Sequence, residues 1–418
     1  MLLKKVFNVL ILSAIILGCS SVNSAGDKTK LARMNWSDKN YEVLNNFITD
    51  YGIGGKYYDA NKAPYVVFDW DQTCGHFDVE EAIMRYQLSH LRFKMTKDQF
   101  AGLLKDEIKG VTKLSADYNN TPLKDINADL IADYNFLYDN YEGLAGKMKL
   151  EDIQKTPQYN DFIAKVAFLY DGYCETKGID ADYGYPWVLY LFAGFTEADV
   201  QALAKEAIQF ELGNKLGKSK WGTPAGFNTK AGPVSYSYKT GLRLYPEMQN
   251  LIFALQSNGI EVWIVSASYK PVIQTISGAD YGYNVPSDRV IAMELGEKNG
   301  IIQPYYKENY PQTQRMGKVE AIKLIIQDGL GKNYDPLMSA GDSDGDYEMS
   351  TEYKDMKLTV VFNRVKGGPI GELSKKAVEQ QGEAYPRFIL QGRDENTGVF
   401  RKSSESIILG KTQPELLK

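Results

Sequence analysis

The apolar run from Tyr65 to Phe68 is followed by two acids, Asp69 and Asp71, with one residue between them. The run contains only β-formers, which is typical of a short buried strand. Because side chains alternate across a strand, a regular continuation would place both acids on one face, about 6 to 7 Å apart. The fold of this chain therefore has to present two carboxylates together at the end of one strand.

Strand-like segments return late in the chain, at 260–268, 289–295, 335–344 and 357–363, with a helical pattern at 315–326 between them. Short buried strands that are separated by helices indicate a parallel α/β sheet. Ligands of such sheets bind at the carboxyl ends of the strands. We therefore predict an α/β, Rossmann-like parallel sheet with its site at that edge.

Between the first strand and the later ones, apolar residues recur at three- and four-residue spacing in 79–93, 130–144 and 197–212, as expected for helices. The segment 76–258 is therefore predicted to be a mainly helical insertion, large enough to form a cap domain. The α/β core would then consist of residues 36–75 and 259–418.

The N-terminus resembles a bacterial lipoprotein signal. Two lysines precede an apolar run from Val6 to Leu17, which is too short to span a bilayer, and Ile16-Leu17-Gly18-Cys19 resembles a lipobox. We expect residues 1–18 to be removed, Cys19 to be lipidated and residues 19–35 to form a flexible polar leash. The protein would then be an extracytoplasmic lipoprotein of the bacterial cell envelope. An ordinary secretory signal with an incidental cysteine is the alternative.

Composition excludes several classes of protein. The chain of 418 residues is 44% hydrophobic and 24% charged, as expected for a folded protein of one or two domains. Its formal net charge of -5 argues against a nucleic-acid binder, which needs clustered positive charge. Three cysteines cannot make a disulfide framework, and with only two histidines a three-histidine zinc site is impossible.

Polar residues stand where the predicted strands end or a helix begins. They are Asp69, Asp71, Thr73, Ser266, Lys318, Asp342, Asp344 and Asp346. If the strands are parallel, these groups meet at one edge of the sheet, and so many carboxylates would repel one another unless a cation sat among them. Oxygen ligands suit a hard ion, so the sequence predicts a Mg²⁺ site.

These segments, in this order, resemble the haloacid dehalogenase superfamily. "DWDQT" is similar to its first motif, Ser266 to the second, Lys318 to the third and "GDSDGD" to the fourth. The long insertion falls between the first two motifs, as in one cap type of this family. The segments "YPEMQNLIFALQSNGIEVWIVSAS" and "FILQGRDENTG" resemble the phosphorylcholine phosphatase branch, which is related to phosphoserine phosphatases.

The resemblance implies a phosphatase mechanism. Asp69 would be the nucleophile and form an aspartyl phosphate, while Asp71 would act as general acid and base. Mg²⁺ would be held by Asp69, the Asp71 backbone carbonyl and Asp342, with Asp346 as a ligand or a support. Ser266 and Lys318 would stabilise the phosphoryl oxygens, and Thr73 would order the turn.

Other interpretations are weaker. The acids of "DSDGD" are spaced as in a calcium loop, but an EF-hand needs Gly where Tyr347 stands and Glu where Tyr353 stands. Alone, Asp69 and Asp71 would be turn caps, and Cys74 a small packing residue. A tethered binding protein without catalysis is the alternative function, and it is disfavoured because every chemical position is filled.

The insertion is expected to choose the substrate. From residue 75 to 260 it has only three arginines, so it offers few guanidinium groups that could bind a substrate carboxylate. It is rich in aromatic residues interleaved with acids, a composition that suits a quaternary ammonium: Tyr134, Tyr138, Tyr141, Tyr170, Tyr173, Tyr185 and Trp187. We therefore predict a small phosphomonoester such as phosphocholine or phosphoethanolamine, with phosphoserine as the alternative. Asp78 stands where phosphoserine phosphatases usually have Glu.

Overall fold

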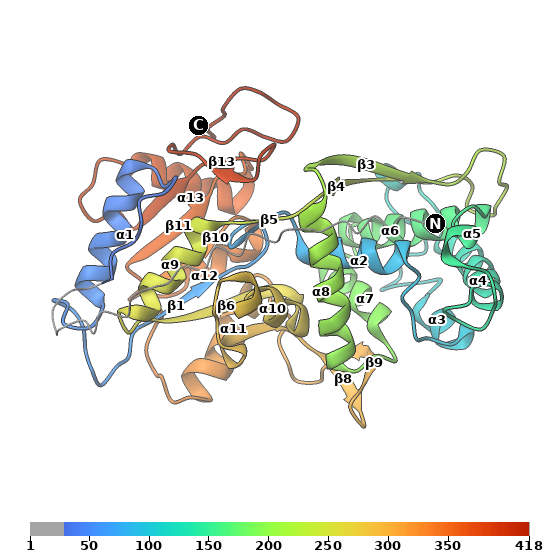
Figure 1. Ribbon diagram of the computed structural model, residues 1–418, viewed down its shortest axis with the longest axis horizontal. Coiled ribbons are helices and arrows are strands. Elements are labelled where there is room, and N and C mark those ends of the chain that lie inside the picture. The colour runs from blue at the N-terminus through green and yellow to red at the C-terminus, as the bar shows by residue number, and fades with distance from the viewer. Residues whose placement is uncertain (1–28, 418) are drawn as a thin grey trace, which may run out of the picture.

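The computed structural model describes residues 29–417, which form a sheet domain and a helical domain side by side (Figure 1). Six parallel strands make up the main sheet, in the order β12-β11-β10-β1-β6-β7. Their bounds are β1 Tyr65–Phe68, β6 Glu261–Tyr269, β7 Val290–Met293, β10 Met338–Gly341, β11 Leu358–Phe362 and β12 Phe388–Gln391. The predicted parallel α/β sheet is confirmed, with β1 between β10 and β6.

The central strands are buried on both faces. Along β1, Val66 and Phe68 join the larger hydrophobic core, which includes residues of α1 and α9, while Tyr65 and Val67 join a second core with residues of α11 and α12. This two-residue alternation places one helical layer on each side of the sheet. The helices of the sheet domain are α1 Asp38–Tyr51, α9 Pro246–Ser257, α10 Lys270–Ile276, α11 Met316–Ile322, α12 Tyr347–Thr351 and α13 Gly368–Glu379.

The helical domain follows β1 and lies at the right of Figure 1. Its helices are α2 Val79–Ser89, α3 Lys97–Leu103, α4 Leu123–Asn140, α5 Leu150–Ile153, α6 Pro157–Glu175, α7 Ala181–Leu189 and α8 Glu197–Gly213. The chain leaves this domain through an antiparallel hairpin, β3 Gly217–Gly222 and β4 Ser235–Thr240. The helical insertion is therefore present as expected, and the hairpin is an addition that the helical pattern did not predict.

The two domains share several connections. Helix α9, which the expected boundary at residue 258 assigns to the insertion, packs against β6 of the sheet.

Three short antiparallel pairs complete the fold: β2 Gly75–His76 with β5 Arg243–Leu244, β8 Leu295–Lys298 with β9 Ile301–Tyr306, and β13 Arg393–Asp394 with β14 Val399–Phe400. Ile302 of β9 exchanges backbone hydrogen bonds with the helical domain, from Gly194 N at 3.0 Å and to Phe195 O at 2.8 Å.

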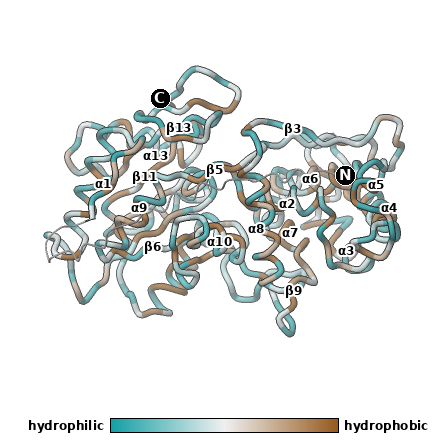
Figure 2. The backbone as a smooth tube through the Cα atoms, viewed as in Figure 1, coloured by the Kyte–Doolittle hydropathy of each residue, from teal (hydrophilic) through white to brown (hydrophobic). Residues whose placement is uncertain are grey.

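Hydrophobic stretches run through both domains, including β6 and α7 (Figure 2). The larger hydrophobic core extends through both domains, with Phe68 of β1 and Leu169 of α6 among its residues. Within residues 29–417, none of the helices combines the length and the apolar character that a bilayer crossing requires.

Candidate active site

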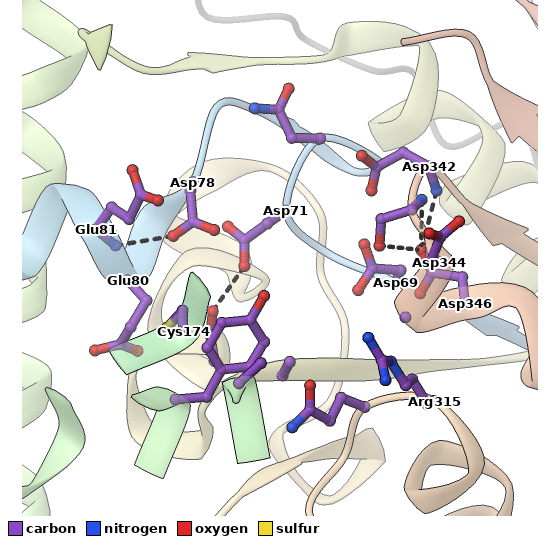
Figure 3. A pocket seen from close by; sticks show the side chains of 18 of the residues that line it. Asp69, Asp71, Asp78, Glu80, Glu81, Cys174, Arg315, Asp342, Asp344 and Asp346 are labelled. Carbon is purple, nitrogen blue, oxygen red and sulfur yellow. Dashed lines mark hydrogen bonds between the residues drawn. The ribbon is translucent and has the colours of Figure 1, made fainter. Parts of the chain in front are cut away.

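The carboxyl ends of the parallel strands face the helical domain, and a cavity of about 420 Å³ lies between the two domains. Figure 3 shows Asp69, Asp342 and Asp346 on the sheet side, Asp78, Glu80 and Glu81 on the helical side, and Asp71 between them. The polar groups that the sequence places at strand ends therefore meet at one edge of the sheet.

Three buried carboxylates form a compact cluster on the sheet side. Asp69 follows β1, and Asp342 and Asp346 follow the neighbouring strand β10. Each offers one oxygen, and these oxygens all lie within 4.8 Å of one another. Such a set of close, negatively charged oxygens needs a cation to balance it, and it fits a hard divalent ion.

Lys318 near the start of α11 partly supplies that balance. Its Nζ donates hydrogen bonds to Asp69 Oδ1 at 2.7 Å and to Asp346 Oδ1 at 2.6 Å. Burial raises the pKa of Asp69 well above its usual range, Asp346 adds to the effect, and Lys318 opposes it. Burial alone would lower the pKa of Lys318, but its two carboxylate partners raise it overall, so the lysine stays charged.

β1 ends at Phe68, so Asp71 lies in the turn that follows the strand and not on a regular continuation of it. Its Oδ1 accepts a hydrogen bond from the Val79 backbone N–H at 2.7 Å, and its Oδ2 accepts one from Ser268 Oγ at 2.7 Å. Burial raises the pKa of Asp71 well above its usual range, and Asp78 and Asp69 add to the effect. A carboxyl group that holds its proton beside a nucleophile is suited to general acid chemistry.

Thr73 lies in the turn that follows β1. Its Oγ1 donates to Asp69 Oδ2 at 3.1 Å and lies 3.4 Å from Asp342 Oδ1. The backbone N–H groups of Thr73 and Cys74 both donate to the carbonyl of Trp70. The turn therefore fixes the orientation of Asp69 against the neighbouring strand.

Ser266 is fully buried within β6 and is not among the residues that line the cavity. Its Oγ accepts a hydrogen bond from the Ser268 N–H at 3.1 Å, and its carbonyl accepts one from Thr313 Oγ1 at 2.5 Å. Ser268, two residues further along the strand, lines the cavity and bonds to Asp71. Strand-end position alone could not distinguish the two serines, because β6 continues to Tyr269.

The helical side of the cavity is acidic and aromatic. Glu81 and Glu175 line it together with the rings of Tyr170 and Tyr185, and Asp78 caps the start of α2 by accepting the Glu81 N–H at 2.8 Å. Burial, with help from Asp78, raises the pKa of Glu81 to about 7. No lysine or arginine of the helical domain lines the cavity within the described part of the chain.

The other predicted aromatic residues belong elsewhere. Tyr134 stacks on Phe100, and Tyr173 and Trp187 pack edge to face, all inside the helical domain. Tyr138 and Tyr141 are partly buried against the hydrophobic core and do not line the cavity.

Neither Cys74 nor His76 takes part in the site. Cys74 is buried in the hydrophobic core. His76 bonds to Tyr245 Oη at 2.7 Å, and burial lowers its pKa to about 3, so it is a neutral structural residue. Cys19 lies outside the described residues.

Arginines on the sheet side were not anticipated from the sequence. Arg364 Nη1 lies 2.7 Å from Asp342 Oδ2, and Lys366 and Arg315 also line the cavity. Arg364 follows β11 by two residues, so the rule that located the acids at strand ends could have found it. Among the described residues, the basic ones that line the cavity come from the sheet domain.

Comparisons with known proteins agree with this geometry. The family model for haloacid dehalogenase-like hydrolases matches residues 227–351, which include Lys318, Asp342 and Asp346. The chain is 24% identical over 252 residues to the phosphorylcholine phosphatase of Pseudomonas aeruginosa, a match that covers 58% of this chain and 52% of that protein. The chain therefore spans about half the length of this relative.

Among solved structures, a protein of Anaerococcus prevotii described as functionally unknown has a TM-score of 0.81 and 29% sequence identity. The match covers 93% of this chain and 100% of that protein, so both domains of the present fold recur there.

Proposed function

Because residues 227–351 belong to a haloacid dehalogenase-like hydrolase domain, we propose that the protein is a Mg²⁺-dependent phosphomonoester hydrolase for small phosphorylated amino alcohols. One observation carries the proposal. The cavity joins a cluster of Asp69, Lys318, Asp342 and Asp346 to an acidic, aromatic wall that has no basic residue within 29–417. The cluster, with its lysine and its proposed metal ion, suits a phosphoryl group, and the acidic, aromatic wall suits a cation.

The carboxylate cluster fits the proposed metal ion. Asp69, Asp342 and Asp346 are buried and supply only oxygen atoms, which Mg²⁺ prefers to nitrogen or sulfur. We propose that Asp69 and Asp342 hold the ion with the backbone carbonyl of Asp71, and that Asp346 is a further ligand or a support. When bound, Mg²⁺ supplies positive charge that neutralises the phosphoryl oxygens.

In the first step Asp69 attacks phosphorus. A bond forms between a carboxylate oxygen and phosphorus, and the ester bond to the alcohol breaks. The proton on Asp71, held by the raised pKa, passes to the departing alkoxide so that a neutral alcohol leaves. Lys318, already bonded to Asp69, stabilises the charge that moves onto the phosphoryl oxygens. Ser268 at the cavity wall holds Asp71 in place through its hydroxyl. Ser266 acts by fixing Ser268 through their hydrogen bond.

In the second step Asp71, now ionised, takes a proton from a water molecule as that water attacks phosphorus. The bond between Asp69 and phosphorus breaks, inorganic phosphate leaves, and both carboxyl groups return to their starting states. The hydrogen bonds that Asp71 accepts from Val79 and Ser268 keep it at the required position for both transfers.

The cation of the substrate would lie against the helical domain. Tyr170 and Tyr185 supply ring faces, and Glu81 and Glu175 supply negative charge, the combination that binds quaternary ammonium groups. A substrate carboxylate would find no basic partner on that wall, which favours phosphocholine and phosphoethanolamine over phosphoserine. The name of the P. aeruginosa relative supports the same substrate class.

We also propose that the protein is anchored in the bacterial cell envelope through a lipid on Cys19, in keeping with the lipobox-like sequence. The boundary expected at residue 75 remains part of this proposal, whereas α9 before residue 258 packs against β6 of the sheet domain.

Steady-state kinetics test the function. Phosphocholine, phosphoethanolamine, phosphoserine and glucose 6-phosphate are compared with added Mg²⁺ and with EDTA, and Asp69→Asn serves as the control for contaminating phosphatases. We expect kcat/KM for the first two to exceed the others by about tenfold or more, and EDTA to remove the activity. A preference for phosphoserine would replace the substrate class. Equal rates on all four would refute selection by the helical domain, and no turnover at all would favour a binding protein.

A further inference from the structure

The segment that follows β11 is a strained turn. Val365 has a φ of 54°, a left-handed conformation that β-branched residues rarely adopt because the side chain crowds the backbone. Its N–H donates to Asn363 Oδ1 at 2.8 Å, which closes the turn. Strain of this kind persists only where the surrounding structure imposes it, and it often accompanies a functional site.

Asn363 imposes the conformation. It is almost fully buried, and its Nδ2 donates to the carbonyls of Ser404 at 2.8 Å and Glu415 at 3.2 Å. Its backbone N–H donates to Gln391 O of the adjacent strand. The turn is therefore fixed from one side by the C-terminal segment, and it presents Arg364 and Lys366 to the cavity on the other side.

Arg364 contacts one carboxylate oxygen of Asp342, and the other oxygen faces a different group. Arg364 Nη1 holds Oδ2 at 2.7 Å, while Oδ1 lies on the side of Thr73 and Asp69. The Arg364 side chain is 20% exposed and that of Asp342 is 3% exposed, so the pair is shielded from water. A guanidinium bonded to one carboxylate oxygen fixes the plane of the group and leaves the other oxygen directed at the acidic cluster.

We propose that Arg364 is a positioning residue for the metal site, which orients Asp342 so that its Oδ1 meets the cation together with Asp69 and Asp346. The inference rests on the proposed function, and it adds a residue that the four sequence motifs do not contain. Groups that orient a metal ligand in this way commonly change metal affinity by about 10- to 100-fold when they are removed.

Binding of Mg²⁺ alone, measured by isothermal titration calorimetry on the full soluble chain, tests this role. The variants are Arg364→Gln, which removes charge and hydrogen bonds, and Arg364→Lys, which keeps the charge without the planar group. Lys375→Gln is the matched control, because it removes the same charge from an exposed position on α13 that does not line the cavity. Circular dichroism in EDTA checks that each variant folds.

We expect Arg364→Gln to weaken Mg²⁺ binding by about 10-fold or more, Arg364→Lys to weaken it less, and Lys375→Gln to leave it unchanged. Excess Mg²⁺ should restore much of the kcat of Arg364→Gln, which a merely damaged fold would not allow. Mg²⁺ binding by Arg364→Gln that equals or exceeds wild type would overturn the inference, since Arg364 would then be a competitor of the metal. A wild-type protein that binds no Mg²⁺ would overturn the metal site itself along with it.

Discussion

Lys318 Nζ lies 2.7 Å from Oδ1 of Asp69, and both groups are almost completely shielded from water. Burial by itself favours the protonated form of Asp69, which could not attack phosphorus. The ammonium group favours the carboxylate form instead. The contact between these two residues therefore opposes the protonation of the proposed nucleophile that burial favours.

Replacing Lys318 by Met should lower kcat by about 100-fold or more, because the variant loses the positive charge that opposes protonation of Asp69 and a donor to the phosphoryl oxygens. Steady-state turnover of phosphocholine measures the effect, with circular dichroism to confirm folding. Lys323→Met, on the exposed side of the turn that follows α11, is the matched control and should retain normal turnover. Near-normal activity of Lys318→Met would remove Lys318 from the mechanism.

Binding of the cationic headgroup should depend on pH through Glu81. Its pKa of about 7 is set by burial first, is raised further by Asp78 and Asp171, and is opposed by Arg85 and Lys239. Because only the ionised carboxylate attracts a cation, the inhibition constant of choline should fall as the pH rises through about 7. Choline carries no phosphate, so titration of a substrate phosphate does not contribute.

Glu81→Gln should weaken choline binding and reduce its dependence on pH. Any dependence that remains comes from Glu80, which lines the same cavity and whose pKa burial raises to about 8. The neutral tert-butyl isostere of choline is the control ligand, and its affinity should not change with pH in either protein. If Glu81→Gln kept the pH dependence of wild type, another group would have to bind the headgroup.

Part of the site could be predicted because ligands of a parallel sheet bind at the carboxyl ends of its strands, which we call the strand-end rule. Asp69, Asp342 and Asp346 follow neighbouring parallel strands, so strand pairing alone brings them together. The rule failed to choose between Ser266 and Ser268, because the exact end of β6 depends on pairing with β7 that the sequence does not display.

The helical wall was harder to predict. Glu81 and Glu175 have the sequence pattern of solvent-exposed helix residues, and they face the cavity only because α2 and α6 pack beside the sheet domain. Of the aromatic residues that suggested a cation site, only Tyr170 and Tyr185 line the cavity. Helical spacing shows that aromatic residues share a face, but it does not show what that face packs against.

The helical domain contains a buried charged group that should control its stability. Lys165 of α6 is fully buried, and its Nζ lies 2.8 Å from Asp129 Oδ2 and 2.7 Å from Asp161 Oδ2. Lys165→Met would leave two buried carboxylates without a cation, so we expect a loss of about 3 to 5 kcal/mol in the free energy of unfolding.

Denaturant unfolding monitored by circular dichroism measures this loss. Lys155→Met is the control, because Lys155 pairs with Asp152 at the exposed surface, where a single ion pair contributes little. Equal stability of the two variants would contradict a structural role for the buried group.

The proposed lipid anchor depends on one residue. Cys19→Ser should move the protein from the membrane fraction to a soluble extracytoplasmic fraction, or leave the precursor unprocessed, because serine cannot accept the thioether-linked lipid. Fractionation with immunoblotting measures this, and Cys174→Ser is the control that should stay with the membrane. A wild-type protein recovered from the cytoplasm would refute the anchor.

The covalent intermediate on Asp69 is the central claim, and mass spectrometry after acid quenching tests it most directly. Asp71→Asn is mixed with an aryl phosphate, whose leaving group needs little protonation, so that formation of the intermediate continues while its hydrolysis slows by about 100-fold or more. We predict that the intact protein gains the mass of one phosphoryl group, that peptide analysis locates it on Asp69, and that the double variant Asp69→Asn/Asp71→Asn gains nothing. Turnover by the wild-type enzyme with no adduct in Asp71→Asn, or an adduct on any other residue, would contradict the account.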